Sequence, residues 1–304
     1  MLLIHIGYHK TGTTWLRHRF FARGDLNFHV FSRYSHDMAA LLHPHALDFD
    51  PEACRRRYAP ALDRCQAEGR VAVITHERLS GDPHSGGYDS KEMAERLHRT
   101  FPEARILIGI REQRSIILSC YKQYIKYGGA CSLADYLKFK GDHRRPQFAM
   151  AHFRYHRLIG RYQNLFDREN VLVQPYERFR SDPPSYMAAI AGFCGVEVPS
   201  GLPYNDFVNT PMRPVALKVK RLLNPLIRRD SVNGYSPYVM AWLGNPSWRL
   251  LQLLDRFTPK PLNARTDAAW KAHIDSVADG YYGESNRRTS ELIGIDLGIH
   301  GYRM

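Results

Sequence analysis

The sequence predicts an α/β fold in which helices cover both faces of a central parallel sheet. Its strand-length apolar runs are nearly continuous rather than alternating, as expected for strands that are buried on both faces. Helical patterns occupy the gaps between these runs, as the crossover connections of a parallel sheet require. The first run ends in a glycine-containing loop that leads into a helix. These three observations favour a three-layer α/β sandwich over an all-helical or antiparallel fold.

The individual elements follow from residue type and spacing. Four runs rich in valine, isoleucine and leucine predict strands at residues 2–7, 70–75, 105–110 and 170–174. Apolar residues at helical spacing predict helices at residues 13–23, 51–68, 91–100, 115–127, 152–166 and 184–194. In open α/β sheets, ligands bind beyond the carboxyl ends of the strands. The residues that directly follow each predicted strand are therefore candidates for the functional site.

The alternation of strands and helices stops near Gly195. Residues 212–261 carry basic helical patterns and six prolines, and no strand pattern is clear there. We therefore expect a single domain over residues 1–304, with its core at 1–196 and a mainly helical C-terminal extension at 197–304.

Composition narrows the class of protein. No apolar run approaches the ~18 residues of a membrane-spanning helix, and the sequence predicts a cytoplasmic protein. The five cysteines form no Cys-x-x-Cys pair, which predicts neither a disulfide framework nor a zinc site. The formal net charge of +13 indicates an anionic ligand, a polyanionic partner or peripheral contact with an anionic membrane surface. A solvated basic surface is the alternative for any single cluster.

The loop at residues 7–14 has the composition of an anion site. A helix N-terminus offers unpaired backbone N–H groups and a positive dipole end, and this turn adds two glycines, a lysine and three threonine hydroxyls. Four residues separate Gly7 from Gly12, as in the nucleotide P-loop. Thr13 and Thr14 follow, however, where that pattern requires lysine and then serine or threonine, and the lysine stands inside the turn at position 10. The competing interpretation is a surface turn in which Trp15 packs in the core.

The octet His9-Lys10-Thr11-Gly12-Thr13-Thr14-Trp15-Leu16 resembles the 5′-phosphosulfate loop of sulfotransferases that use 3′-phosphoadenosine 5′-phosphosulfate (PAPS). That loop commonly reads Pro-Lys-(Ser/Thr)-Gly-Thr-Thr-Trp-Leu, so His9 replaces a proline. The resemblance implies a P-loop NTPase-like fold and PAPS as the sulfuryl donor, without a metal. It also implies a donor-binding segment made of His9, Lys10, Thr11, Gly12, Thr13, Thr14 and Trp15.

A second motif follows the strand predicted at residues 105–110. Arg111, and Ser119 eight residues later, resemble the 3′-phosphate motif of the same family, although Gln113 stands where proline often occurs. An arginine fork and a serine hydroxyl suit a dianionic phosphate. A weaker resemblance begins at residue 171 and places Tyr176 near the adenine, with a packed aromatic ring as the alternative. The resemblance ends at about residue 196.

Sulfuryl transfer needs a base for the acceptor proton and cations for the departing oxygen. Lys10 is the candidate cation. His76 and Glu77 follow the strand predicted at residues 70–75 and are the candidate bases. The Thr75-His76 pair resembles the Thr-His of cytosolic sulfotransferases, in which histidine is the base, and an imidazole titrates near neutral pH. There are three alternatives for Glu77: it is itself the base, it orients His76, or it pairs with Arg78.

The acceptor is less defined by the sequence. The aromatic and basic residues at 121–127 are suited to holding a sugar or an anion. The alternative interpretation is an ordinary amphipathic helix with a solvated face. We expect a hydroxyl-bearing or amine acceptor such as a glycan, a glycoconjugate or a lipid-linked sugar.

A kinase would require lysine after Gly12 and an aspartate-ended strand for magnesium, and neither is present. A non-catalytic basic nucleotide- or nucleic-acid-binding protein is the other alternative, but no nucleic-acid-binding motif accompanies the charge.

Overall fold

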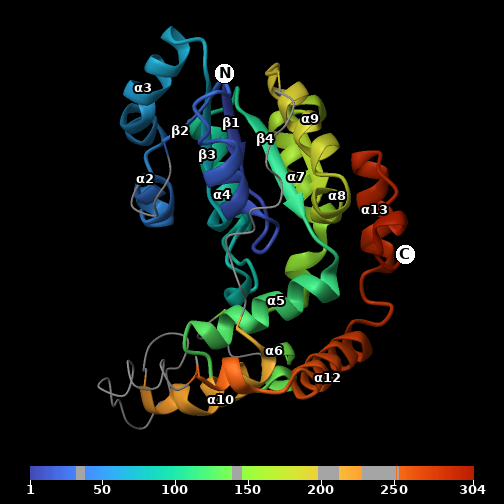
Figure 1. Cartoon of the computed structure of the whole chain (residues 1–304). Helices are drawn as coiled ribbons and strands as arrows, with labels where there is room; N and C mark the ends of the chain where they lie inside the picture. The colour runs from blue at the N-terminus through green and yellow to red at the C-terminus, as the bar shows by residue number, and fades with distance from the viewer. Residues whose placement is uncertain (32–37, 139–145, 198–211, 228–250, 252) are drawn as a thin grey trace. The chain divides into compact units, whose positions relative to one another are not determined.

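The computed structural model describes residues 1–31, 38–138, 146–197, 212–227, 251 and 253–304 (Figure 1). The chain divides into two compact units. The first unit contains Met1–Gln113, Ala151–Val208 and Tyr282–Met304, and the second contains Arg114–Met150 and Asn209–Tyr281. Two segments depart from the division expected from the sequence: residues 114–150 cluster with the second unit, and residues 282–304 cluster with the first.

The first unit is built on a parallel sheet with the strand order β2-β3-β1-β4-β5. Its strands are β1 (Leu2–His5), β2 (Phe28–Val30), β3 (Val71–Thr75), β4 (Arg105–Ile110) and β5 (Val171–Pro175). All five residues of β3 are buried, which explains its unbroken apolar run. The predicted α/β class and four of these strands are confirmed. The short strand β2 was not predicted.

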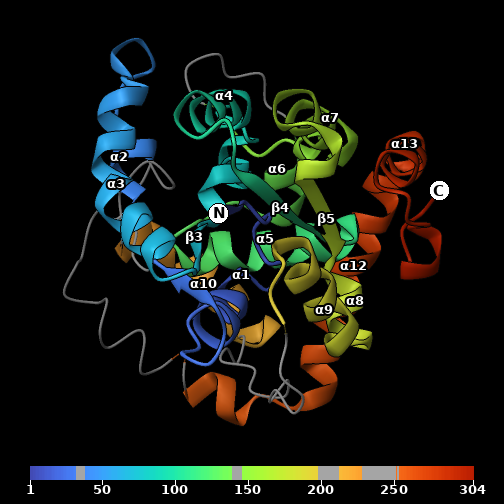
Figure 2. The ribbon, with the colours of Figure 1, turned by 90° about the horizontal axis from the view of Figure 1, so that it is seen from above.

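Helices cover both faces of this sheet (Figure 2). One face carries α3 (Pro51–Ala67), α4 (Ser90–Thr100) and α7 (Tyr155–Phe166), with α13 (Gly283–Ile293) packed on α7. The other face carries α1 (Thr13–Trp15), the π-helical turn η1 (Leu16–Phe20), α8 (Tyr176–Ser181) and α9 (Pro183–Cys194). The unit is therefore the three-layer sandwich that the sequence predicts.

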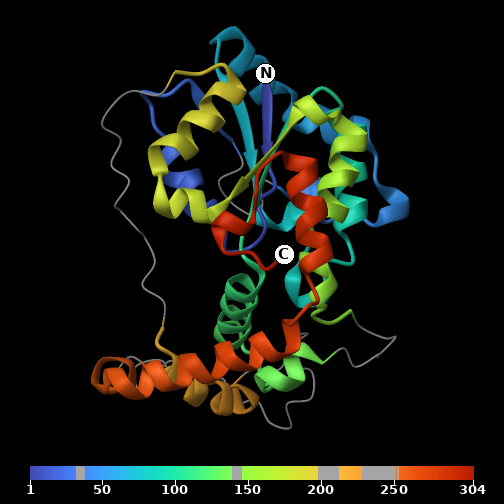
Figure 3. The same ribbon diagram turned by 90° about the vertical axis from the view of Figure 1, so that its right-hand side faces the viewer.

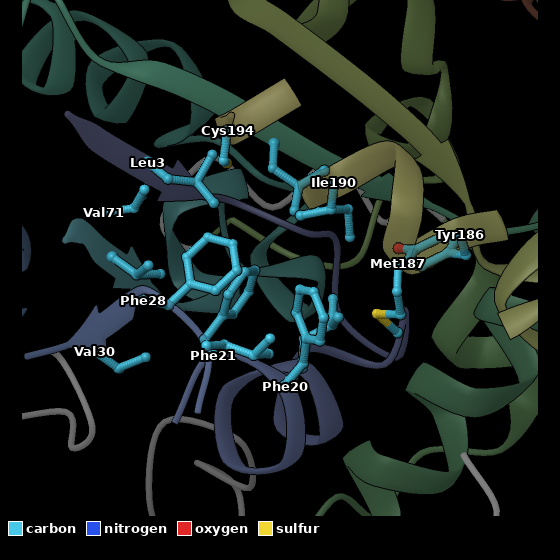
Figure 4. Close-up of a cluster of buried hydrophobic side chains, with 14 of the residues drawn as sticks. Leu3, Phe20, Phe21, Phe28, Val30, Val71, Tyr186, Met187, Ile190 and Cys194 are labelled. Atoms are coloured by element: carbon cyan, nitrogen blue, oxygen red, sulfur yellow. The ribbon is translucent and has the colours of Figure 1, made fainter. Parts of the chain in front are cut away.

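A cluster of buried aromatic and aliphatic side chains fills the layer between the sheet and the helices η1 and α9 (Figure 4). The ring centroid of Phe28 lies 5.5 Å from that of Phe20 and 5.2 Å from that of Phe21. Ile190 and Met187 of α9 close the cluster. Trp15 is 6% exposed and packs on Phe179, so its indole is a core residue that fixes the start of the helix after β1.

Short helical segments occupy connections of the first unit. They are α2 (Ala39–Leu42), η3 (Ala46–Asp48), η4 (Glu77–Ser80), η5 (Pro83–Ser85), η6 (Met150–Phe153, which overlaps the unit boundary), η7 (Arg168–Asn170) and η9 (Gly298–His300). The segment η6 explains why α7 begins at Tyr155 and not at residue 152: the preceding residues form a separate 3₁₀ turn.

The second unit is helical in its described part. It contains α6 (Leu133–Leu137), α10 (Pro214–Ile227) and α12 (Lys260–Ala278), together with all but the first residue of α5 (Gln113–Lys126). The amide Nδ2 of buried Asn224 donates to the carbonyl oxygens of Ile125 and Gly129, at 2.8 and 2.7 Å. Tyr121 packs edge-on against Trp270, and α10 lies beside α12 (Figure 3). None of the helices in the described ranges is long and apolar enough to cross a membrane.

Candidate functional site

The loop at residues 7–14 follows β1 at the edge where the carboxyl ends of the parallel strands meet. The backbone N–H of Tyr8 donates to the carbonyl of Gly109 at 2.9 Å, which fixes the loop to the end of β4. Lys10 and Gly12 both have positive φ, 68° and 86°. A left-handed lysine costs about 1–2 kcal/mol. Such strain is typical of functional loops, and here it turns the chain into the helix that begins at Thr13.

The inner side of the loop is lined by polar atoms. A Cβ atom on Gly7 would lie 2.7 Å from His5 Nε2, 2.9 Å from Thr11 Oγ1 and 3.1 Å from Thr13 Oγ1, so only glycine fits there. The Thr11 hydroxyl donates to the carbonyl of Tyr8 at 2.6 Å. Thr13 is 5% exposed, and its hydroxyl has no hydrogen-bond partner within the described ranges. A buried hydroxyl in this position suits an additional polar ligand atom.

We expect Gly7→Ala to destabilise the first unit. The added methyl group overlaps His5 and Thr11, and overpacking of this kind costs about 1–3 kcal/mol. Gly24→Ala is the matched control, because a Cβ at Gly24 meets nothing within 4 Å. Thermal unfolding of both variants measures the difference. Equal melting temperatures for the two variants would contradict the close packing at Gly7.

Arg111 contacts two other predicted donor-site residues. Its Nη1 donates to the carbonyl of Lys10 at 3.0 Å, and its guanidinium lies 4.9 Å from the ring centroid of Tyr176. The phenol of buried Tyr155 donates to the carbonyl of Arg111 at 2.5 Å, which holds the end of β4 in place. Tyr176 also touches the loop, because a Cβ on Gly12 would lie 3.4 Å from its ring. The structure therefore brings together Lys10, Gly12, Arg111 and Tyr176.

Four of the predicted donor-site residues differ in exposure. Thr14 and Lys10 are exposed, whereas His9 is 7% exposed. Ser119 lies on α5, is half-buried and belongs to the second unit. Its contribution to a phosphate site stays a prediction.

His76 and Glu77 stand at the end of β3, beside the strand that leads into the loop. The backbone N–H of His76 donates to the carbonyl of His5 at 3.2 Å. Nδ1 of His76 accepts from the backbone N–H of Arg78 at 3.1 Å. Glu77 pairs with Arg17 of η1, with 3.0 Å between Oε2 and Nη2. Arg78 pairs with Asp89 at 2.7 Å instead of with Glu77.

The electrostatic environment separates the two candidate bases. Burial lowers the pKa of His76, so the ring is neutral at neutral pH. Burial alone would raise the pKa of Glu77, but His76, His9 and Arg17 outweigh it and lower that pKa to about 2. Because Arg17 is permanently charged, its ion pair is the contact that keeps Glu77 ionised.

Two further histidines near the loop were missed from the sequence. Burial lowers the pKa of His84, and Lys10 contributes in the same direction. His152 lies with its ring centroid 5.0 Å from that of Tyr8, and burial lowers its pKa to about 4. Burial likewise lowers the pKa of His9 to about 3, and His84 and His152 add to the effect. The histidines in and near the loop are therefore neutral imidazoles, which are able to form hydrogen bonds but add no positive charge. The only sequence signal was the large number of histidines, 15 in all.

The aromatic residues proposed for an acceptor pocket serve mainly in packing within the second unit. Tyr121 and Tyr124 are 1% and 8% exposed. Lys122 pairs with Asp267 at 2.5 Å. Tyr127 is 48% exposed.

The residues of the described ranges form no group of three or more His, Cys, Asp or Glu side chains arranged for a metal ion.

The arrangement at the carboxyl edge of the sheet is suited to an anion with several oxygen atoms. Lys10 supplies an exposed cation, the loop supplies backbone N–H groups at a helix start, and Thr13 supplies a hydroxyl. Arg111 adds a second cation beside an aromatic ring. A neutral imidazole and a carboxylate stand at the neighbouring strand end.

Comparisons with known proteins agree with this arrangement. Residues 89–200 match the family model described as "Sulfotransferase family". That segment includes Arg111, Ser119 and Tyr176 but not the loop at residues 7–14, so the match and the loop motif are independent observations. No curated protein matches the chain.

One of the solved structures that match has the same fold over nearly the whole chain. A sulfotransferase from Alicyclobacillus acidocaldarius superposes with a TM-score of 0.57 at 16% identity, covering 98% of each chain. The sulfotransferase domain of the curacin biosynthetic pathway matches with a TM-score of 0.43 at 13% identity, over 79% of this chain and 83% of the other. The sulfotransferase domain of the olefin synthase of Synechococcus PCC 7002 gives 0.41 at 14% identity, over 85% and 95%. Only the first score supports an argument about the fold.

Proposed function

We propose that this protein transfers a sulfuryl group from PAPS to an acceptor hydroxyl or amine, because residues 89–200 match the sulfotransferase family model and the chain has the fold of a solved sulfotransferase. The observation that carries the proposal is the loop at residues 7–14, in which Lys10 is exposed inside the turn and fixed beside Arg111. A loop of this kind, without lysine after Gly12, is arranged for a sulfated phosphate and not for phosphoryl transfer with magnesium.

The 5′ end of the donor is assigned to the loop. The exposed lysine, the backbone N–H groups at the helix start and the hydroxyls of Thr13 and Thr14 would hold the phosphate and sulfate oxygens. The buried Thr13 hydroxyl, which has no hydrogen-bond partner within the described ranges, supports this fit. His9 and Thr11 are buried beneath the loop and would shape it, while Trp15 anchors the following helix in the core.

The 3′-phosphate is assigned to Arg111, and the contribution of Ser119 stays a prediction from the sequence. The guanidinium already stacks on Tyr176, which would lie near the adenine. The N–H donors of an arginine point outward from the edge of the guanidinium, in a fork that matches the oxygen atoms of a phosphate, and a ring packed against the face of the guanidinium does not cover that edge. A kinase that binds ATP has no 3′-phosphate to recognise.

Removal of Arg111 gives a specific test of this assignment. We expect Arg111→Ala to weaken binding of 3′-phosphoadenosine 5′-phosphate (PAP) about 10- to 100-fold, the value of one or two charge-assisted hydrogen bonds. Binding of AMP, which lacks the 3′-phosphate, should change much less. Arg57→Ala, an exposed arginine on α3, is the control. Calorimetric titration measures all three proteins. An equal loss for PAP and AMP would mean that Arg111 acts only by shaping the loop through the Lys10 carbonyl.

The chemical step moves a neutral sulfur trioxide unit between two oxygen atoms, or from oxygen to nitrogen. The S–O bond to the donor phosphate breaks, the bond to the acceptor forms, and the acceptor proton goes to a base. Lys10 would stabilise the negative charge that develops on the departing phosphate oxygen. The step needs no metal ion and no redox cofactor.

The base is His76 or Glu77, and each has one feature in its favour. His76 is neutral at neutral pH and therefore able to accept a proton. Its Nδ1 accepts the backbone N–H of Arg78, which places the ring proton on Nε2, so this hydrogen bond has to open before Nδ1 takes the acceptor proton. Glu77 is ionised, but a carboxylate with a pKa of about 2 that is paired with Arg17 is a weak base. The weak basicity of Glu77 is the stronger of these arguments, and we therefore assign the base to His76.

The acceptor class follows from the charge. A chain with a net charge of +13 suits an acceptor that is itself anionic or attached to an anionic carrier, such as a glycan, a glycoconjugate or a lipid-linked sugar.

A further inference from the structure

The positive charge of this protein belongs almost entirely to its second unit. Residues 114–150 and 209–281 contain 18 lysines and arginines against seven aspartates and glutamates, a net charge of +11. The first unit contains 25 against 23, a net charge of +2, although it carries the predicted donor loop. The basic character therefore is not explained by the donor site.

The outward face of α10 combines a lysine with two leucines. Lys218, Leu222 and Leu226 follow one another at intervals of four residues and share one side of the helix. Leu222 is 65% exposed and Leu226 is 37% exposed, whereas Leu217 and Asn224 are buried in the unit. An ordinary surface helix presents polar residues on its outward face, so exposed leucines in this register require an explanation.

A second exposed apolar run lies next to α10. Leu253 is 53% exposed, Phe257 is 74% exposed and Leu262, in the first turn of α12, is 48% exposed. The helices α10 and α12 pack together, and the backbone N–H of Arg213 donates to Asp255 at 2.7 Å. Exposed Arg256 and Lys260 interrupt this run. Basic and apolar side chains thus alternate over neighbouring elements of one unit.

We propose that this surface of the second unit, formed by Leu222, Leu226, Phe257 and Leu262 with Lys218 and Lys260, docks onto an anionic lipid bilayer. Lysines and arginines are attracted to anionic headgroups, and each contributes to binding near the membrane surface. Exposed leucine and phenylalanine side chains enter the boundary between headgroups and acyl chains, as in interfacial amphipathic helices. A polyanionic glycan or nucleic acid would use the charges and hydrogen-bond donors but would leave these apolar side chains in water.

Sedimentation of the full-length chain with lipid vesicles tests the proposal. We expect binding to vesicles of phosphatidylcholine mixed with phosphatidylglycerol, and much weaker binding to phosphatidylcholine alone. Binding should weaken as salt screens the charges. Leu222→Glu combined with Phe257→Glu should reduce the partition coefficient at least about tenfold, because two apolar side chains no longer enter the membrane.

Two control variants keep the test specific. Leu47→Glu combined with Ile299→Glu changes two apolar residues of the first unit that are more exposed than Leu222 and Phe257, at 89% and 76%, and this variant should bind vesicles as the parent chain does. PAP binding, measured in parallel, should be unchanged in both double variants. Failure of the parent chain to bind anionic vesicles, or equal binding by the Leu222 and Phe257 variant, would overturn the proposal. Heparin binding with no vesicle binding would assign the charge to a polyanion and would also overturn it.

Discussion

Replacement of Lys10 by alanine is expected to reduce turnover about 1,000-fold while the fold remains intact. The lysine is exposed, and the position of its side chain inside the turn is suited to a phosphate oxygen that gains charge in the transition state. Removal of one such cation costs about 10²–10³ in rate. The substrate affinity should fall less than the rate, because the developing charge exists only in the transition state.

The stability of this variant separates catalysis from folding. Alanine keeps a Cβ at the left-handed position, so the backbone strain at φ 68° is nearly unchanged and the melting temperature should be too. Lys91→Ala, on the surface of α4, is the matched control, since its side chain is 77% exposed. Rates of sulfate transfer from radiolabelled PAPS measure the effect. Unchanged transfer by the Lys10 variant would remove this lysine from the chemical step.

The second large effect concerns the base. We expect His76→Asn to reduce turnover about 10²- to 10⁴-fold, the usual contribution of a general base. Asparagine retains an acceptor for the N–H of Arg78, so the turn after β3 keeps its hydrogen bond. Glu77→Gln removes the charge beside Arg17 and is expected to have a smaller effect on rate.

The pH dependence of the parent enzyme distinguishes the two candidates. A base must be unprotonated to act, so the rate rises as the pH rises through the pKa of the base. Burial lowers the pKa of His76 from 6.5, so the rising limb should lie below pH 6.5, with a plateau at neutral pH. Glu77 has a pKa of about 2, and as the base it would give no rising limb in the range in which the protein stays folded. A flat acid limb together with an inactive Glu77→Gln variant would assign the base to Glu77.

The sequence predicted the sheet well because its strands are buried on both faces. Strands β1, β3, β4 and β5 have short, continuous apolar runs, and such runs are typical of strands that are buried on both faces. The segment Phe28–Val30 has only three residues, with a histidine between two apolar ones, and it becomes a strand through pairing with β3. Such pairing is a tertiary contact that no local pattern contains.

The site was predictable where it depends on the ends of strands. The loop after β1, Arg111 after β4 and His76 after β3 converge because parallel strands end at one edge of the sheet. His84 and His152 were not predictable, because they come from connecting segments whose course depends on packing. The concentration of positive charge was also hidden, since residues 114–150 and 209–281 form one unit although they are far apart in the sequence.

The most direct test of the proposed function is a calorimetric comparison of PAP and ATP as ligands of the parent chain. An arginine assigned to a 3′-phosphate and a loop without lysine after Gly12 favour PAP. We predict saturable binding of PAP at one site, with ATP at least about tenfold weaker for lack of one or more charge-assisted hydrogen bonds. Tighter binding of ATP, or binding of neither nucleotide, would contradict a sulfotransferase that uses PAPS.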